Sequence, residues 1–193
     1  LLGTTAMTVA GLLFSAPVKA QTGTQHTIPT NPVVQAGTIG SITTTNPNFL
    51  NGNTRTITVN QSSQRAVINW NTFNVGTKGH ARFNQPNASG LTVNRVVGAN
   101  DDPSRIFGRL SANGTVVILD RNGVFFGSNA NIDVGGLIAS TGNLEGTDAD
   151  FVNGTGSFAL NNIEGGGTVR NDADISVKDG GLLAFVAPYI QNN

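Results

Sequence analysis

The sequence contains no cysteine, and only 11% of its 193 residues are charged. Without cysteine no disulfide can stabilise the fold, so its stability has to come from hydrogen-bonded strands and packed side chains. The charged share is less than half of what soluble domains usually carry, whereas glycine, with 25 residues, is abundant. Because valine, isoleucine and phenylalanine still recur in compact runs, the composition favours a folded, β-rich domain over a disordered chain.

Helical periodicity and clustered catalytic groups are also lacking. No window of about eleven residues shows the apolar i, i+3, i+4, i+7 stripe of an amphipathic helix, so helix content should be minimal. The only histidines, His26 and His80, have neither cysteine nor carboxylate at ligand spacing, so no metal site is expected. Asp101 and Asp102 are adjacent and would point to opposite sides of an extended chain, which makes a poor catalytic pair. The sequence therefore predicts no enzyme, no cofactor and no metal.

Acidic residues are missing from the first half of the chain. No Asp or Glu occurs in residues 21–100, whereas all eleven follow from Asp101 onward. This asymmetry can guide a partner electrostatically. The basic residues of the first half are spread out and not interleaved with aromatic residues, so we interpret them as separate, solvated charges and expect no nucleic-acid binding. They are Arg55, Arg65, Lys78, Arg82 and Arg95.

Residues 1–20 are typical of a secretory signal peptide. Their apolar stretch ends in Val18-Lys19-Ala20, and polar residues follow. We expect cleavage after Ala20, in a signal peptide that is truncated at its start because neither Met nor a basic segment precedes the apolar stretch. Residues 21–193 are long enough for one core, and we expect them to form one domain of the N-terminal part of a larger exoprotein.

Strand patterns dominate the rest of the chain. Residues 54–60 alternate strictly between polar and apolar, and residues 65–70 continue in β-prone residues. Residues 116–119 (VVIL) and 124–126 (VFF) are continuous apolar runs, each preceded by an Asn-Gly dipeptide that tolerates positive φ in a turn. Runs that are apolar on both faces indicate strands buried from both sides, as in a wound parallel coil.

An internal repeat indicates a solenoid. Residues 130–139 (ANIDVGGLIA) reappear as residues 173–184 (ADISVKDGGLLA), offset by 43 to 45 residues, with Leu137 matched by Leu182. Repeats of this kind gain stability by stacking on one another. With about 20 residues per turn of the coil, this offset predicts two turns. A β-sandwich is the alternative interpretation and ranks second. Its strands should alternate between polar and apolar more strictly than residues 116–119 do.

Five sequence blocks fall in the order and spacing of a known family. They are residues 70–76 (WNTFNVG), 81–98 (ARFNQPNASGLTVNRVVG), 103–118 (PSRIFGRLSANGTVVI), 122–127 (NGVFFG) and 135–141 (GGLIAST). With these blocks, residues 35–188 resemble the N-terminal secretion domain of filamentous haemagglutinin-like exoproteins, the passengers of two-partner secretion in Gram-negative bacteria. The resemblance implies an all-β fold, a right-handed parallel β-helix (β-solenoid) with an N-terminal cap and extra-helical strands.

The resemblance also implies a function. Such a domain is recognised by the periplasmic modules of an outer-membrane β-barrel transporter, which secretes the exoprotein to the cell surface or the medium. It implies a secretion-targeting and folding-nucleation domain of an adhesin-like protein, whose C-terminal part would contact host-cell receptors or glycans. The alternative is a β-helix that binds carbohydrate or cleaves polysaccharide, which rests on fold analogy alone, because the sequence offers no cluster of acids and bases.

The family carries two Asn-rich signatures, usually NPNL and NPNGI, which are candidates for transporter recognition. Block order places the first on Gln85, Pro86 and Asn87. The second falls on residues 120–124 and keeps only Asn122 and Gly123 of the pattern. Both signatures have the composition of turns, so a structural role in stacking the coil is the alternative interpretation.

Asn94 and Arg95 are a further candidate pair for transporter recognition. An Arg beside an Asn in an apolar strand can tie the extra-helical strands to the body of the helix through several donors.

Overall fold

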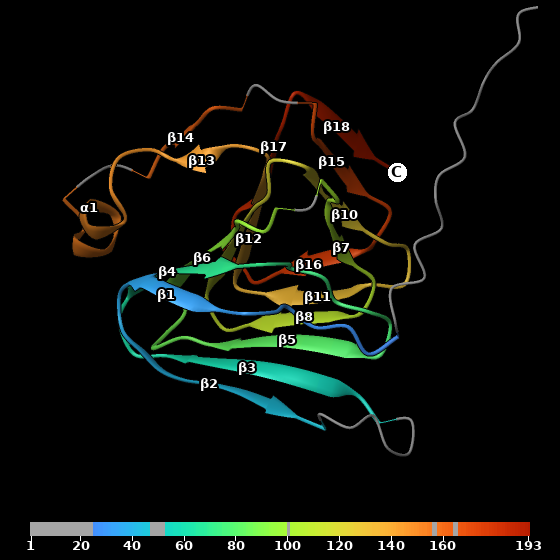
Figure 1. The fold of residues 1–193 in the computed structure, drawn as a ribbon, viewed down its shortest axis with the longest axis horizontal. Coiled ribbons are helices and arrows are strands. Elements are labelled where there is room, and N and C mark those ends of the chain that lie inside the picture. Colours follow the sequence, from blue (N-terminus) through green and yellow to red (C-terminus); the bar gives the residue numbers. More distant parts are fainter. Residues whose placement is uncertain (1–24, 47–52, 100, 156–157, 164–165) are drawn as a thin grey trace, which may run out of the picture.

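A computed structural model describes residues 25–46, 53–99, 101–155, 158–163 and 166–193. The expected signal peptide, residues 1–20, lies outside the described residues. Figure 1 shows a coil of strands that passes repeatedly through three sheets, with a small extension on one side.

The first sheet contains six strands, which are β2 (Ile39–Thr45), β3 (Arg55–Gln61), β5 (Gly79–Asn84), β8 (Arg109–Ala112), β11 (Asn131–Val134) and β16 (Ile175–Val177). All neighbours are parallel except β2 and β3. Side chains in register form continuous apolar rows inside the coil, because every second residue of a strand points inward. One such row is Ile57, Ala81, Leu110 and Ile132, all of them buried.

The second sheet contains β1 (Val33–Ala36), β4 (Arg65–Trp70), β6 (Leu91–Val96), β9 (Thr115–Leu119), β12 (Gly136–Ser140) and β17 (Leu183–Val186), in that spatial order. Here β1 alone is antiparallel to its neighbour. The third sheet contains β7 (Ser104–Ile106), β10 (Gly123–Phe126), β15 (Thr168–Asn171) and β18 (Tyr189–Asn192), all parallel.

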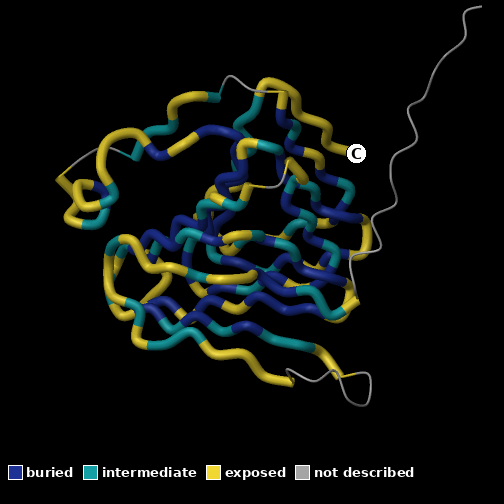
Figure 2. The backbone as a smooth tube through the Cα atoms, viewed as in Figure 1, coloured by how far each residue is buried: buried dark blue, intermediate teal, exposed yellow. Residues whose placement is uncertain are grey.

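From β5 onward, each turn of the coil runs from the first sheet to the second and then to the third. The fold is therefore the expected all-β, right-handed parallel β-helix. Its N-terminal cap is formed by β1 and β2, the two strands that run against their neighbours. The buried residues follow the strands of the coil (Figure 2), and their apolar side chains form one core cluster.

An extra-helical unit lies between β12 and β15. It consists of β13 (Asn143–Leu144), α1 (Asp148–Asn153) and β14 (Leu160–Asn161), and β13 pairs with β14 in antiparallel orientation. Leu144 and Phe151 of this unit pack on the outer face of the second sheet. The second sheet is thus buried on both faces, which explains the continuous apolar run of β9. The outer apolar side chains of this sheet are Val67, Val93, Val117, Leu119 and Ile138.

The helix α1 was not predicted from the sequence, although the expectation of minimal helix content holds for the described residues. The side chain of Thr147 caps its first turn by accepting a hydrogen bond from the Asp150 backbone N–H, and Gly154 ends it in the left-handed conformation. Within the described part of the chain, no helix is long and apolar enough to span a bilayer.

The interpretation of the repeat as two turns was wrong. Ile132 pairs directly with Ile175, and Val134 with Val177, so the 43-residue offset is a single turn lengthened by the extra-helical unit. A turn without an insertion is shorter, since Arg109 pairs with Asn131, 22 residues later. In the second sheet Leu137 pairs with Leu183 rather than with Leu182, which is 57% exposed.

Candidate functional site

Gln85 lies at the corner where the chain leaves the first sheet for the second. Its side chain is buried. Its Nε2 donates to the carbonyl oxygens of Gly90 (3.3 Å) and Thr115 (2.8 Å). The same nitrogen donates to Thr92 Oγ1 (3.0 Å), and Gln85 Oε1 accepts from the N–H of Gly114 (2.7 Å). Gln85 therefore fastens two consecutive turns to each other, and its amide is already occupied by hydrogen bonds within the fold.

Pro86 and Asn87 lie on the exposed side of the same corner. Asn87 Oδ1 accepts from the N–H of Ser89 (2.9 Å), and its carbonyl oxygen accepts from the N–H of Gly90 (3.0 Å). These bonds hold the turn in one shape. Of the first signature, Pro86 and Asn87 are therefore the residues that present side chains to solvent.

Asn94 points into the coil and is fully buried. Its Oδ1 accepts a hydrogen bond from Trp70 Nε1 (3.0 Å). Its Nδ2 donates to the carbonyl oxygens of Thr92 (3.3 Å) and Val117 (3.2 Å). Because every polar atom of the amide has a partner in the core, Asn94 satisfies the indole of Trp70 and cannot reach a transporter from the folded state.

Arg95 ties the extra-helical unit to the coil. Its guanidinium donates to both carboxylate oxygens of Asp148 in α1 and to Asn69 Oδ1 (3.3 Å). Arg65 acts in the same way, since its Nη1 donates to the carbonyl oxygen of Phe151 (2.9 Å) and its guanidinium lies 5.3 Å from that ring's centroid. The interpretation of Arg65 and Arg95 as separate solvated charges was wrong, because these two basic residues of the first half hold an acidic helix of the second half.

The second signature forms the corner between the second and third sheets. Gly123 has a φ of +116°, and a Cβ there would lie 2.4 Å from the carbonyl oxygen of Thr168. Asn122 donates its N–H to Asp120 Oδ1 (3.0 Å), and Asp120 Oδ2 also accepts from Ser104 N (2.9 Å) and Oγ (2.7 Å). Burial raises the pKa of the Asp120 carboxyl above its ordinary value, although these hydrogen bonds oppose the shift. Sequence reasoning did not single out Asp120, the residue that organises this corner.

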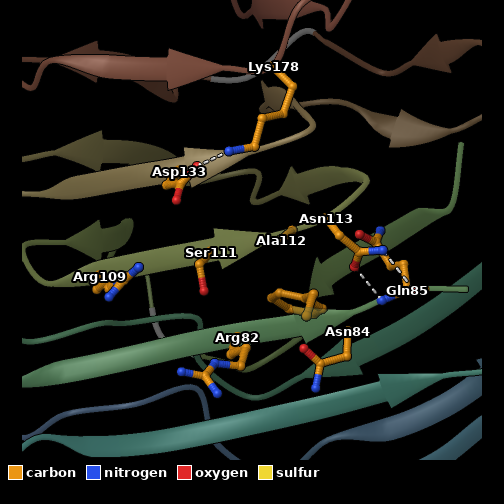
Figure 3. A pocket seen from close by; sticks show the side chains of 10 residues that line it. Arg82, Asn84, Gln85, Arg109, Ser111, Ala112, Asn113, Asp133 and Lys178 are labelled. Atoms are coloured by element: carbon orange, nitrogen blue, oxygen red, sulfur yellow. Dashed lines mark hydrogen bonds and ion pairs between the residues drawn. The ribbon is translucent and has the colours of Figure 1, made fainter. Parts of the chain in front are cut away.

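A shallow depression of about 530 Å³ lies on the outer face of the first sheet and reaches the Gln85 corner (Figure 3). Arg82 and Arg109 line it from adjacent strands, and Lys178 lines it from the far side, where its Nζ lies 2.8 Å from Asp133 Oδ1. Asp133 is the one acidic residue in its lining. A pair of carboxyl groups for acid–base chemistry is therefore not present in this depression.

His80 lies beside this depression. Its Nε2 is 2.7 Å from Ser111 Oγ. Burial, and to a smaller extent the positive charges of Arg109 and Arg82, lower the pKa of His80 from the ordinary value of 6.5 to about 4. The outer face of the first sheet is thus electropositive around a neutral imidazole.

We expect the free energy of unfolding to fall as the pH drops from 6.5 to 4, because only the unfolded chain gains a proton on His80 in that range. One pKa unit corresponds to about 1.4 kcal/mol, and solvent screening reduces the effect, so the loss should be about 1–2 kcal/mol. Urea unfolding at both pH values, for the natural chain and for His80→Gln, measures it. A His80→Gln variant with the same loss of stability between these pH values would contradict the assignment to His80.

Metal binding finds no support in the described part of the chain, where no three His, Cys, Asp or Glu residues cluster as metal ligands.

A family model described as the TPS secretion domain matches residues 30–193. Two curated proteins from Haemophilus influenzae, both called "Heme/hemopexin-binding protein", are similar in sequence. One is 43% identical over 89 residues, which is 46% of this chain and 9% of that protein. The other, from strain ATCC 51907 / DSM 11121 / KW20 / Rd, is 35% identical over 114 residues, 59% of this chain and 12% of that protein. The chain thus spans about a tenth of the length of these relatives.

Among solved structures, the crystal structure of the HMW1 secretion domain from Haemophilus influenzae is similar, with a TM-score of 0.69 and 24% sequence identity. The match covers 86% of this chain and 41% of that chain. At this identity the likeness concerns the fold.

Proposed function

Because this chain belongs to the TPS secretion domain family, we propose that it is the secretion-targeting and folding-nucleation domain of a larger exoprotein. Family members are exported through an outer-membrane transporter, and the family is one of targeting domains rather than enzymes. The observation that carries the proposal is the family match across residues 30–193, nearly all of the β-helix. The cognate partner is then an outer-membrane β-barrel transporter with periplasmic modules, and the destination is the cell surface or the medium.

The edge of β2 is the surface that we assign to the first contact with the transporter. Among the described strands, β2 pairs with β3 alone, so its other edge presents backbone donors and acceptors to solvent. Its sequence, IGSITTT, carries no charge that would repel an added strand. A strand from the periplasmic modules can extend the first sheet here by main-chain hydrogen bonds. The exposed turn at Pro86 and Asn87 leads out of the same sheet.

Folding nucleation follows from the way in which the turns stack. Each turn pairs with the one before it strand against strand, so the first turns can template the following ones as the chain emerges. Buried amides such as Gln85 and Asn94 pair with backbone groups of the following turn. Each new turn therefore adds buried area and hydrogen bonds, which disfavours backward movement through a pore.

We expect the exoprotein fragment to reach the medium only when its transporter is present. The test places the chain behind a functional signal peptide, expresses it with and without a cognate transporter gene, and quantifies it in periplasm and medium. Release in both strains, or retention in both although the transporter exports its natural substrate, would contradict the targeting function.

A second experiment tests the edge of β2 separately. Thr43 is exposed on β2, and a lysine there should hinder strand addition because charged edge side chains oppose pairing. We expect Thr43→Lys to reduce export at least about fivefold. Ser176→Lys, at the exposed position of β16 on the other edge of the same sheet, should leave export unchanged. Equal export of both variants, with unchanged thermal unfolding, would exclude the edge and leave the targeting function standing.

The activity of the larger protein is a separate question. An adhesin-like role, with host-cell receptors or glycans bound by the C-terminal part, is our proposal from the filamentous haemagglutinin resemblance. The two relatives called "Heme/hemopexin-binding protein" support a second candidate, an exoprotein that binds haem or haemopexin. Binding of the full-length secreted protein to immobilised haemopexin, compared with binding to epithelial cells, distinguishes these two roles.

A further inference from the structure

The outer face of the third sheet carries a strip of two aromatic and two arginine side chains. Arg105, Phe125 and Arg170 lie in register on β7, β10 and β15. Phe107 follows two residues after Arg105, and its ring meets that of Phe125 edge to face, with centroids 5.3 Å apart. The ring of Phe107 occupies the space that a side chain at position 127 would fill, since a Cβ on Gly127 would lie 2.3 Å from it. The strip is therefore a rigid feature of the sheet.

The charges of the strip are not balanced. Arg170 lies over the ring of Phe125, 4.9 Å from its centroid, and forms an ion pair with Asp172. Arg105 is different, because its Nε is buried and has no hydrogen-bond partner among the described residues. Its backbone N–H is held by Asn74 Oδ1 (2.8 Å), which fixes the position of the residue. The residue as a whole is half-buried and lines the depressions described next, so an anion there can pair with the charge of its guanidinium.

Two depressions meet at Arg105. One, of about 270 Å³, lies between Arg105, Phe107 and the polar side chains of Thr27, Thr72 and Asn74. The other, of about 320 Å³, lies on the opposite side of Arg105, and its lining includes Phe125, Arg170, Thr168 and Gln191. The lining of both combines hydroxyl and amide groups with an aromatic edge, and neither lining contains an acidic residue.

We propose that this strip binds an acidic saccharide, with a sugar carboxylate or sulfate on Arg105 and the apolar face of the ring against Phe107 and Phe125. A planar guanidinium matches a carboxylate with two parallel hydrogen bonds, and aromatic side chains bury the C–H face of a sugar. The surrounding hydroxyl and amide groups suit sugar hydroxyls. A nucleic acid would need a row of unpaired cations to neutralise successive phosphates, whereas Arg170 already pairs with Asp172.

Titration calorimetry of the purified chain with a short oligogalacturonate and with a heparin fragment tests the proposal. We expect at least one of them to bind. Methyl esterification of the galacturonate, or desulfation of the heparin fragment combined with N-acetylation and carboxyl reduction, should weaken that binding at least about tenfold because the charge on the sugar is lost. Arg105→Gln should weaken it to a similar extent. Arg105→Lys keeps the charge but not the planar guanidinium, so its affinity should lie between those of the natural chain and of Arg105→Gln.

The matched control is Arg82→Gln, an exposed arginine on the outer face of the first sheet, which should leave the affinity unchanged. Thermal unfolding of each variant separates loss of binding from loss of fold. Three results would each overturn the proposal: no binding of either probe, equal binding of the uncharged derivative, or equal loss in Arg82→Gln and Arg105→Gln. An equally tight complex with a single-stranded oligonucleotide would also overturn it, in favour of general polyanion binding.

Discussion

Replacing Gly114 with alanine is expected to lower the free energy of unfolding by about 3 kcal/mol or more, because the corner between the first two sheets has no room for a Cβ. An added Cβ would lie 2.3 Å from the carbonyl oxygen of Gly90 and 2.8 Å from Gln85 Oε1. The backbone cannot move away easily, since the Gly114 N–H donates to that same Oε1 at 2.7 Å. Urea unfolding followed by circular dichroism measures the loss.

The matched control is Gly166→Ala. A Cβ at Gly166 meets nothing within 4 Å, and the backbone there is not in the left-handed region, so stability should change by less than about 0.5 kcal/mol. Similar unfolding midpoints for the two variants would show that the corner opens at little cost. In that case the stacking of Gly90 under Gly114, and of Gly114 under Gly135, would not determine the spacing of the turns.

The β-rich coil could be predicted from the sequence, whereas the number of turns could not. Strict alternation in residues 54–60 and the apolar run of residues 116–119 identified β3 and β9 correctly. The offset between the repeats counts residues rather than turns, so the extra-helical unit made one turn look like two. An insertion that leaves the register of the neighbouring strands intact is not visible in the repeat itself.

The extra-helical unit that covers the outer face of the second sheet was harder to predict than the strands of that sheet. The run VVIL indicated burial on both faces, and the structure confirms it for β9. The helix among the elements that bury the outer face is α1, whose six residues are too few for an apolar stripe. The one local signal was Thr147 three residues before Asp150, a pattern typical of a helix start.

The candidate recognition residues separate into two groups that the sequence did not distinguish. Gln85 and Asn94 are polar, and polar residues are usually placed on the surface, yet both are buried where their amides pair with backbone groups of the next turn. Arg95 finds its partner Asp148 at a distance of 53 residues along the chain, and no pattern links the two. Pro86 and Asn87 remain exposed in a turn, and Asn122 is half-buried in another, so these positions keep both a turn role and access to a partner.

Asn94→Ala is expected to destabilise the fold by about 3 kcal/mol, because it leaves the buried Trp70 indole N–H and the Val117 carbonyl without this partner and opens a cavity. For a chain of this size the loss corresponds to a midpoint lower by about 6–12 °C. Asn131→Ala, on the exposed side of β11, serves as the control and should lie within about 0.5 kcal/mol of the natural chain. Thermal and urea unfolding measure both variants.

A double-mutant cycle with Trp70→Phe separates the hydrogen bond from the packing of Asn94. In the Trp70→Phe background the indole N–H is already absent, so Asn94→Ala should cost about 1 kcal/mol less than in the natural chain. If the cost is the same in both backgrounds, the bond from Trp70 Nε1 to Asn94 Oδ1 does not contribute, and the amide is retained for its bonds to Thr92 and Val117 alone. A coupling of the expected size would mean that Asn94 affects export through the stability of the stacked turns, because its amide is enclosed in the core that forms only after the chain has folded.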